Sequence, residues 1–382
     1  MAYRQCVGLL VAAGIGLSMV ACSEDPEPAP APRPQAAESP APTTPPEPQV
    51  VELGEGTPRV IDSFNVGDQV YVRSLAVEPA NNGLWVGTSV GVLEIDLATH
   101  EMRNTFTRDH GLANEYVFAI HVDRAGHKWF GTNAGGVSRF HDDDWQVYFP
   151  MHGLADYWIY SFAEQADGVL WIGTWAGVNR VTLDNLEFTT YLDELVNEWV
   201  YGIDIDSKNR VWFGTEGGMS MFDGETWRHW THESGMGAPN LKNQPHSTNT
   251  GLGTRSRHSL SVLSQGEETY NPNYVFAVKV DDQDQVWAGT WGGGVARFDG
   301  NQWTNYTIEN GLAGNIVYSI AREPSGVLWF GTNRGLTRYD GTTWTVYDRD
   351  KGLLDNNVYA IAVAPNGEVW AGTKRGVARL GM

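Results

Sequence analysis

Acidic residues and histidines are the first candidates for chemistry, but their spacing does not build a known catalytic or metal site. Segments 204–209 (DIDSKN) and 281–284 (DDQD) resemble fragments of calcium-binding loops, yet neither has the glycine and terminal glutamate of an EF-hand loop. Both fall where a hairpin turn is needed, so we interpret them as turn residues. No histidine pair has zinc spacing on a helix, no Gly-x-Ser-x-Gly elbow occurs, and the ten histidines are scattered over different blades of the repeat described below. The sequence therefore predicts no catalytic residue, no metal site and no cofactor.

Aromatic side chains are better candidates, because flat apolar rings with polar tips stack on sugars and aromatic ligands. They recur at two positions of a repeat, two residues apart at the start of its first strand, and should therefore point to the same side of that strand. The first position holds Tyr71, Tyr116, Trp158, Trp199, Tyr274, Ile316 and Asn357. The second holds Arg73, Phe118, Tyr160, Tyr201, Phe276, Tyr318 and Tyr359.

From these positions and two loop tryptophans, we predict a ligand-binding site of aromatic residues and one arginine. Its members are Tyr71, Arg73, Tyr116, Trp158, Trp175, Trp199, Tyr274 and Trp291. The alternative for the first position is ordinary packing under loops. The second position is expected to pack between blades, although Arg73 breaks its aromatic pattern and could reach a ligand.

The marker of the repeat is Trp-x-Gly-Thr, at Trp85, Trp129, Trp171, Trp212, Trp287, Trp329 and Trp370. The intervals are 44, 42, 41, 75, 42 and 41 residues. The sixth copy contains four β-like runs, at 317–321, 327–331, 336–339 and 344–347, separated by turn residues. Four strands, a to d, in about 42 residues are typical of a propeller blade. We expect the tryptophan to pack between blades and the glycine to admit the neighbouring backbone.

The ends of the repeat region predict how the ring closes. The last copy stops after its third strand, at 377–380, whereas segment 59–64 precedes the first copy without a blade of its own. Pairing these two segments would complete the last blade and protect its edge. We therefore predict an all-β fold, a seven-bladed β-propeller closed by an N-terminal strand that pairs with the C-terminal blade.

The pattern V-x-A-I-x-x-D-x-x-G-x-L-W-x-G-T-x-x-G-G-x-x-R-F-D-G-x-x-W, seen in residues 275–312 and 317–353, resembles the two-component regulator propeller repeat. The resemblance covers residues 58–382 apart from one insertion. It implies the extracytoplasmic sensing part of a membrane histidine kinase, often associated with polysaccharide use. This sequence has no transmembrane helix after the propeller and no kinase region. We therefore expect any sensing role to act through a partner.

Loops of one face are expected to carry the function. In an a-b-c-d meander the b–c turns and the d-to-a crossovers emerge at the same end, and here both vary in sequence. The 75-residue interval adds an insertion at about 237–271 to that face, with several basic residues. A long loop of this kind is either a lid or docking element, or functionally silent. Its positive charge favours an anionic ligand weakly.

The first 54 residues are predicted to export and anchor the chain. Residues 1–21 have the short apolar run of a signal peptide, and Met19-Val20-Ala21-Cys22 resembles a bacterial lipobox. Cleavage would discard Cys6, the other cysteine, and acylation would consume Cys22. Plain secretion is the alternative. Residues 22–54 form a Pro/Ala-rich linker, and 55–382 form the propeller. Ser23 after the cysteine favours the outer membrane in a two-membrane cell.

Composition supports this scheme and excludes one class of partner. The chain has 46 acidic and 26 basic residues among 382, a net charge of -20, which argues against nucleic-acid binding. We expect a cell-envelope protein that binds an extracellular or periplasmic ligand, plausibly a glycan, and works through an envelope protein or a membrane sensor kinase. The alternatives are an interaction scaffold that uses the insertion, and a propeller lyase or hydrolase acting on a polysaccharide.

Overall fold

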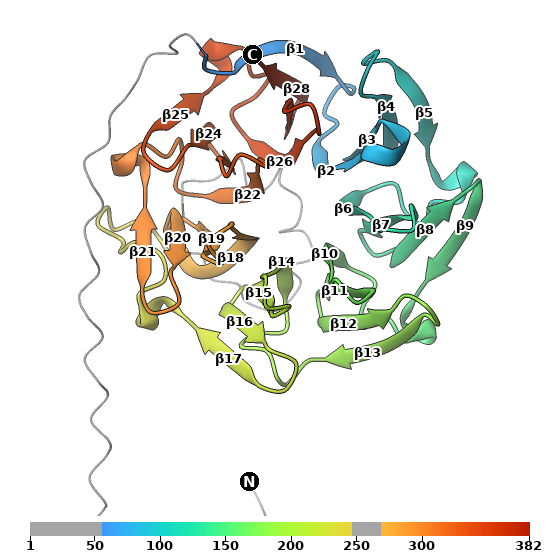
Figure 1. The fold of residues 1–382 in the computed structure, drawn as a ribbon, viewed down its shortest axis with the longest axis horizontal. Helices are drawn as coiled ribbons and strands as arrows, with labels where there is room; N and C mark the ends of the chain where they lie inside the picture. The colour runs from blue at the N-terminus through green and yellow to red at the C-terminus, as the bar shows by residue number, and fades with distance from the viewer. Residues whose placement is uncertain (1–55, 247–268) are drawn as a thin grey trace, which may run out of the picture. The chain divides into compact units, whose positions relative to one another are not determined.

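Seven four-stranded antiparallel sheets surround a common centre in the computed structural model, which describes residues 56–246 and 269–382 (Figure 1). In each sheet the first strand lies nearest the centre and the last lies at the outside (Figure 1). The prediction of a seven-bladed β-propeller is therefore confirmed. Within these residues there is no α-helix, and no helix is long and apolar enough to cross a membrane.

Blades 1 to 4 follow one another along the chain in the same order of strands. Blade 1 contains β2 (Val72–Glu78), β3 (Gly83–Thr88), β4 (Gly91–Asp96) and β5 (Met102–Phe106). Blade 2 contains β6 (Val117–Val122), β7 (Lys128–Thr132), β8 (Val137–His141) and β9 (Asp144–Tyr148). Blade 3 contains β10 (Ile159–Glu164), β11 (Val169–Thr174), β12 (Gly177–Thr182) and β13 (Glu187–Tyr191). Blade 4 contains β14 (Val200–Ile205), β15 (Val211–Thr215), β16 (Gly218–Phe222) and β17 (Trp227–Trp230).

The remaining blades include the one that joins the two ends of the ring. Blade 5 contains β18 (Asn271–Val280), β19 (Val286–Trp291), β20 (Val295–Phe298) and β21 (Trp303–Tyr306). Blade 6 contains β22 (Val317–Arg322), β23 (Leu328–Thr332), β24 (Gly335–Tyr339) and β25 (Trp344–Tyr347). Blade 7 contains β26 (Val358–Val363), β27 (Val369–Thr373), β28 (Gly376–Gly381) and, as its outer strand, β1 (Arg59–Asn65). The antiparallel pairing of β1 with β28 confirms the predicted closure.

Crossovers between blades share a local design that follows from their sequence. Five contain a 3-10 turn: η2 (Arg108–His110), η3 (Pro150–His152), η4 (His232–Ser234), η6 (Ile308–Asn310) and η7 (Arg349–Lys351). A sixth such turn, η1 (Pro79–Asn81), lies in the a–b turn of blade 1. Each crossover turn ends at a glycine with positive φ, from 96° to 114°, and an apolar side chain follows it into the core. These buried side chains therefore pack the crossovers against the blades.

The Trp-x-Gly-Thr motif joins neighbouring blades, as its residue types predict. All seven tryptophans are at most 2% exposed. A Cβ atom on Gly131 would lie 2.6 Å from Cγ2 of Ile159 in the next blade, so the glycine is needed for close approach. The hydroxyl of each motif threonine donates to a glycine carbonyl across the b–c turn, as Thr132 does to Gly136 at 2.9 Å. The motif is thus structural at every position.

Six of the seven motif indoles donate to a side-chain oxygen six or seven residues earlier in the sequence. The acceptors are Glu78, Asp123, Gln165, Asp206, Asp281 and Glu323, all in or beside the a–b turn. Asp206 and Asp281 also accept turn backbone N–H groups, which agrees with the interpretation of their segments as turns. In blade 7 the corresponding residue is Ala364, and the buried indole nitrogen of Trp370 has no hydrogen-bond partner within the residues described.

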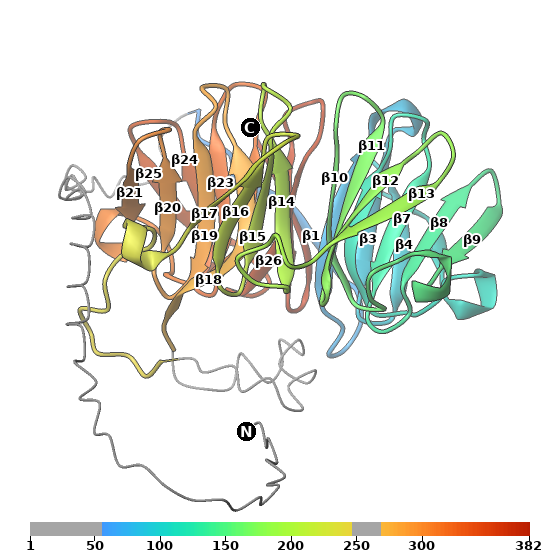
Figure 2. The ribbon, with the colours of Figure 1, turned by 90° about the horizontal axis from the view of Figure 1, so that it is seen from below.

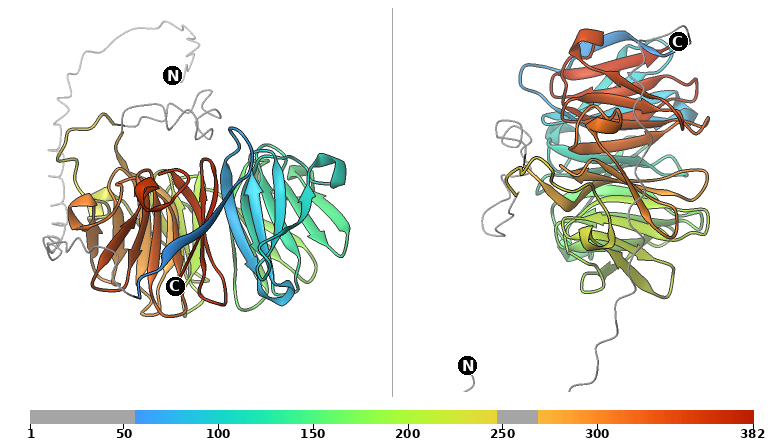
Figure 3. Two further views of the ribbon diagram at one scale, coloured as in Figure 1. Left: turned by 90° about the horizontal axis from the view of Figure 1, so that it is seen from above. Right: turned by 90° about the vertical axis from the view of Figure 1, so that its left-hand side faces the viewer.

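The insertion begins and ends at the face that carries the b–c turns. Its first residues follow η4, and Figures 2 and 3 show this segment leaving the blades at the end where β18 begins. The backbone N–H of Ala238 donates to the carbonyl of Gly293 in the b–c turn of blade 5 at 2.9 Å. The predicted placement of the insertion is confirmed for its two ends. Residues 247–268, together with the predicted signal peptide, Cys22 and the predicted linker, lie outside the described residues.

Candidate functional site

The second aromatic position forms a closed belt around the centre of the ring. From Phe118 to Tyr359, the ring centroids of successive blades lie 4.9 to 6.0 Å apart. Arg73 closes the circle, because its Cζ atom lies 5.0 Å from the centroid of Phe118 and 5.6 Å from that of Tyr359. We call this set the aromatic belt; its members are Arg73, Phe118, Tyr160, Tyr201, Phe276, Tyr318 and Tyr359.

A β-bulge places each belt residue. In β2, Val72 pairs with Thr88 and Ser74 pairs with Gly87, so that Arg73 has no residue opposite it. The same register shift occurs in the inner strand of all seven blades. A bulge redirects the side chain of the extra residue. Here the redirected side chains line a central cavity of about 70 Å³, so the belt serves as a lining as well as packing.

Three tryptophans of the predicted site come together at the mouth of the ring, on blades 3 and 4. The rings of Trp175 and Trp199 stack with centroids 4.5 Å apart, and Trp158 lies 6.3 Å from Trp175. The backbone N–H of Trp175 donates to the carbonyl of Trp158 at 3.1 Å, which ties the b–c loop to the inner strand. Trp158 is buried, whereas Trp175 and Trp199 are only half-buried. We call these three residues the tryptophan cluster.

The backbone of the tryptophan cluster is held by side chains just before the inner strands. The carboxylate of Asp156 accepts the N–H of Trp158 at 2.8 Å, and the amide oxygen of Asn197 accepts that of Trp199 at 3.0 Å. Such turns fix the direction in which each strand begins. The cluster is therefore built on fixed backbone, which favours a preformed binding surface over an adaptable one.

Tyr274 and Trp291 belong to a buried hydrophobic group, against which Trp199 of the tryptophan cluster packs, and both are covered. Their rings stack with centroids 5.7 Å apart, and they are 9% and 4% exposed. The indole nitrogen of Trp291 donates to Oγ1 of Thr269, at the end of the insertion, at 2.8 Å. The insertion thus seals this part of the predicted site. Sequence spacing alone could not show this, because it depends on where the inserted segment returns.

Tyr71 and Tyr116, the other two predicted residues, are half-buried on blades 1 and 2. Tyr71 exchanges hydrogen bonds with Ser89 at 3.0 and 3.2 Å. Tyr116 lies against the belt, 4.8 Å from Phe118, and its hydroxyl oxygen is buried. The structure therefore divides the predicted site into a tryptophan cluster, a covered pair and a central group around Arg73.

Glu216 is a site residue that sequence reasoning did not select. Its carboxylate accepts a hydrogen bond from the hydroxyl of Tyr201 at 3.2 Å, and its side chain is buried. Burial, followed by the neighbouring Tyr274 and Glu216, raises the pKa of Tyr201 well above its ordinary value. Glu216 directly follows a Trp-x-Gly-Thr motif. That position, which also holds Trp175 and Trp291, is the signal that would have identified it.

The two ends of the insertion form a neck beside blade 5. The backbone N–H of Tyr270 donates to the carbonyl of Pro245 at 2.9 Å, and its hydroxyl donates to the carbonyl of Ala238 at 2.8 Å. A cavity of about 350 Å³ lies between the first part of this neck and the crossover of η6. Leu241 in its lining is 75% exposed. Lys242 and Glu309 bring opposite charges to the same cavity.

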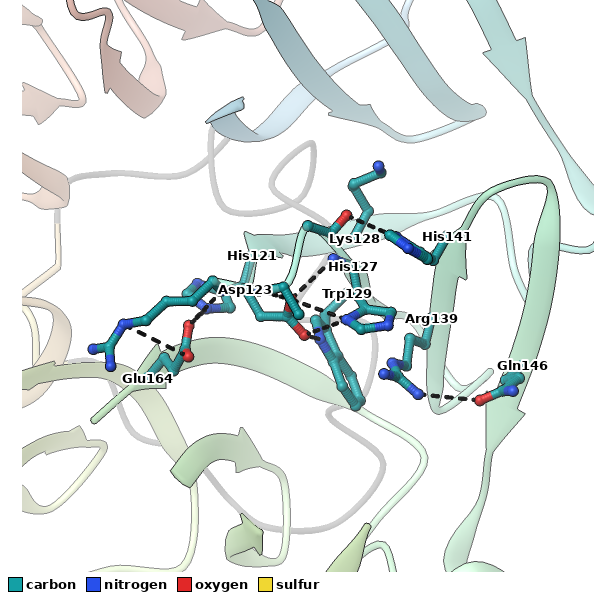
Figure 4. Close-up of polar contacts among 12 residues, drawn as sticks. His121, Asp123, His127, Lys128, Trp129, Arg139, His141, Gln146 and Glu164 are labelled. Atoms are coloured by element: carbon teal, nitrogen blue, oxygen red, sulfur yellow. Dashed lines mark hydrogen bonds and ion pairs between the residues drawn. The ribbon is translucent and has the colours of Figure 1, made fainter. Parts of the chain in front are cut away.

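Several histidines lie on blade 2. The expectation that the histidines are scattered over different blades was wrong for this blade. His127 and His141 lie with ring centroids 4.4 Å apart, beside a cavity of about 230 Å³. His121, also on blade 2, pairs with Glu164 of blade 3 at 3.3 Å (Figure 4). The antiparallel register of β7 and β8 brings the a–b turn next to the end of β8, which residue spacing did not reveal. This group lies at the turns opposite the mouth.

In Figure 4, Asp123 contacts both Trp129 and His127. Its carboxylate accepts from the indole of Trp129 at 2.9 Å and lies 3.0 Å from Nδ1 of His127. Burial acts to raise the pKa of this carboxyl, but the hydrogen bonds from Trp129 and His127 outweigh it and leave the pKa below its ordinary value. Asp123 is thus occupied in structural contacts. Over the ranges that the structure describes, no three His, Cys, Asp or Glu side chains are arranged to hold a metal ion.

Three segments of the chain, 153–176, 311–334 and 352–375, match the family model described as two component regulator propeller. These are two component regulator propeller repeats. Each matched segment runs from the crossover glycine through both aromatic positions and Trp-x-Gly-Thr to the b–c loop. The expected family resemblance is therefore confirmed, and Trp158 and Trp175 of the tryptophan cluster lie within a matched segment. A sequence comparison with curated proteins gave no match.

Solved propellers share this fold at low sequence identity. The extracellular domain of a protein named as a hybrid two component system from B. thetaiotaomicron superposes with a TM-score of 0.67 and 18% identity, over 84% of this chain and 41% of that one. A second such domain from B. thetaiotaomicron gives 0.61 and 19%, over 84% and 39%. The propeller thus spans about two fifths of these domains. Virginiamycin B lyase from Staphylococcus aureus gives 0.62 and 13%, over 84% of this chain and 98% of the lyase.

Proposed function

We propose that this chain is a ligand-binding propeller of the sensor type, which recognises a carbohydrate outside the cytoplasm and acts through a partner. The observation that carries the proposal is the tryptophan cluster at the mouth. Two of its rings are stacked and half-buried, unlike the motif tryptophans, which are fully buried in blade packing. Flat aromatic surface held at a concave face is what stacks on sugar rings.

The comparisons support the sensor part of the proposal. The B. thetaiotaomicron proteins with the same fold are named as extracellular domains of two component systems. The propeller would report ligand binding through contact with a membrane sensor kinase or another envelope protein. The chain has a net charge of -20, which repels phosphate groups, so nucleic acid is an unfavourable partner.

We further propose that the chain is a lipoprotein anchored in the cell envelope, in the outer membrane where the cell has two. The lipobox-like end of the apolar run supports acylation at Cys22. Labelling of cells with an alkyne-bearing fatty acid tests this directly. The wild-type chain should become labelled and fractionate with membranes, and Cys22→Ser should lose the label. An unlabelled wild-type chain in the soluble fraction would instead support plain secretion.

Glycan binding is tested with the purified full chain and a panel of neutral and uronic-acid-containing oligosaccharides, by calorimetry. For any oligosaccharide that binds, Trp199→Ala and Trp175→Ala should weaken binding about 30-fold, since an anchoring aromatic side chain contributes about 2 kcal/mol. Trp199→Phe, which keeps a flat ring, should retain most of the affinity. The motif tryptophans are unsuitable controls, because their loss would unfold the blades.

A matched control separates binding from general surface effects. Leu192 is an exposed apolar side chain in the crossover from blade 3 to blade 4, 42% exposed, and lies outside the tryptophan cluster. Leu192→Ala should bind oligosaccharides as the wild type does. Thermal unfolding of every variant should stay close to the wild type. Equal affinity of Trp199→Ala and the wild type for a bound oligosaccharide contradicts the proposed site.

A second candidate function, an interaction scaffold, is favoured by the exposed Leu241 on the neck of the insertion. Tyr270 is buried in the neck, so a deletion should leave the neck intact. The test variant therefore lacks only residues 247–268, and a short glycine linker joins the two ends. Loss of a co-purifying envelope protein with intact oligosaccharide binding would favour the scaffold. Loss of oligosaccharide binding with the partner retained would favour ligand sensing.

We propose binding rather than turnover, and a direct assay decides between them. The lyase among the structural neighbours shares the fold with this chain but only 13% of its sequence. The full chain at high concentration is incubated with the oligosaccharides that bind, and products are separated by chromatography. Binding without new products is expected. Product formation that Glu216→Gln abolishes would establish a propeller enzyme instead.

A further inference from the structure

We propose that the central cavity binds an oxyanion, a carboxylate or phosphate group, at Arg73 and the hydroxyl group of Tyr359, which both line it. This inference concerns the centre of the ring and does not depend on the tryptophan cluster. The ion is either a small free anion or the acidic group of a larger ligand that enters through the mouth. Both sources present the same chemistry to the cavity.

Arg73 is the first element of the argument. Along the described part of the chain it makes no ion pair, whereas Arg103, Arg210 and Arg379 each pair with carboxylates. Its guanidinium instead lies between two belt rings, and its Nε atom is buried without a hydrogen-bond partner. Arg73 as a whole is only partly buried, but a buried nitrogen of a charged group without a partner is costly. An anion in the cavity would supply the missing partner and could be held by two parallel hydrogen bonds.

Two tyrosine hydroxyls are the second element. The side chains of Tyr116 and Tyr359 carry buried hydroxyl oxygens without a hydrogen-bond partner, and Tyr359 is only 5% exposed. Tyr359 lines the cavity together with Arg73, whose Cζ atom lies 5.6 Å from its ring centroid, and Tyr116 lies against the belt, 4.8 Å from Phe118. Buried hydroxyls that bond to nothing are rare in folded proteins and call for a bound group. A neutral phenol can donate to an oxyanion.

The size of the cavity fits such a ligand. Its volume of about 70 Å³ is several times the roughly 10–15 Å³ that one water needs. Nearby carboxylates are already engaged: Glu216 accepts from Tyr201, and Asp355 accepts from Asn357 and lies 3.6 Å from Arg375. Arg73 is therefore the charged residue that lines the cavity.

Calorimetry on the full chain tests the inference with three probes at constant ionic strength: inorganic phosphate, acetate, and a uronic-acid disaccharide beside its neutral counterpart. Binding of phosphate or acetate, weakened about tenfold or more in Arg73→Met, is the expected result. Tyr359→Phe removes only a hydroxyl from a retained ring and should weaken binding severalfold. Arg73→Lys, which keeps the charge without the fork, should bind with intermediate affinity.

The outcomes separate the sources and keep this inference distinct from the proposed function. Binding of phosphate or acetate identifies a small free anion, while binding of the uronic-acid disaccharide alone, lost in Arg73→Met, identifies the acidic group of a larger ligand. Leu192→Ala, in an exposed crossover, should leave phosphate binding unchanged. Failure of oligosaccharides to bind while phosphate still binds would remove the proposed function but retain the central site. No binding of any acidic probe, or equal binding by the wild type, Arg73→Met and Tyr359→Phe, would overturn the inference.

Discussion

Replacement of Asp123 tests whether the bonds from the turn carboxylates to the motif indoles stabilise the propeller. Asp123→Ala removes the acceptor of the Trp129 indole, a donor on a side chain with no exposed surface. An unsatisfied buried donor costs about 1–3 kcal/mol. The same change removes the turn bonds from the N–H groups of Ala125 and His127, at 3.0 and 2.9 Å. Those amides are partly solvated, so the total loss should be about 2–4 kcal/mol.

Asp123→Asn is the matched variant. It keeps a side-chain oxygen of the same reach, and Gln165 in blade 3 shows that a neutral amide can accept from a motif indole, at 2.7 Å from Trp171. Its cost should be about 1 kcal/mol. Blade 7 offers the reciprocal test, because Ala364→Asp would supply the absent acceptor for Trp370. That variant should gain about 1 kcal/mol, reduced by the burial of a charge.

Urea unfolding followed by tryptophan fluorescence gives the free energy of unfolding of each variant from its midpoint and slope. The Asp123 carboxyl adds a pH signature. Its pKa is lower in the folded chain than the ordinary 3.8, so the stability it contributes is present above pH 3.8 and is lost as the pH falls through the folded pKa. Asp123→Asn should lose that part of the acid dependence. Ala and Asn variants that agree within about 0.5 kcal/mol would refute the reasoning.

Three further predictions concern the blade interface, the tyrosines and the belt. Gly131→Ala should cost about 1–3 kcal/mol of unfolding free energy by overpacking, whereas Gly83→Ala, whose Cβ would meet nothing closer than 3.6 Å, should be nearly neutral in the same urea titration. Burial raises the pKa values of Tyr201 and Tyr359 above the ordinary 10.0, so stability should fall as the pH rises above about 10, and the tyrosinate absorbance of these two residues should appear only on unfolding, after that of exposed tyrosines such as Tyr157. Arg73→Tyr should raise the unfolding free energy by about 1 kcal/mol and abolish phosphate binding, measured by urea titration and calorimetry.

The sequence was sufficient to predict the ring, because its information is local and repeated. Turn residues at fixed offsets define four strands, and the segment at 59–64 completes the last blade, where β1 spans Arg59–Asn65. The structural role of Trp-x-Gly-Thr follows from side-chain size alone. The acceptors of the motif indoles were also visible in principle, as an acidic residue or glutamine six or seven positions before six of the tryptophans.

The candidate site was only partly predictable, because it depends on register and on chain return. A bulge in every inner strand turns the belt residues toward the cavity, and alternation along an ideal strand does not predict a bulge. Trp291 is covered because Thr269 at the end of the insertion returns to its indole. The contact of His127 with His141 arises across paired strands. In each of these contacts, the spacing of the residues along the sequence does not indicate that they meet.

Comparison of the seven repeats with one another distinguishes positions that serve stability from positions that serve binding. The motif Trp, Gly and Thr are the same in every repeat, and each has a structural contact that explains it. The belt position is aromatic in six repeats and Arg73 in one. Packing does not require this exception, since a seventh aromatic ring would continue the belt without burying a charge. A residue that breaks a local rule at a cost in stability, beside a central cavity and unbonded hydroxyls, is best explained by a ligand that pairs with it.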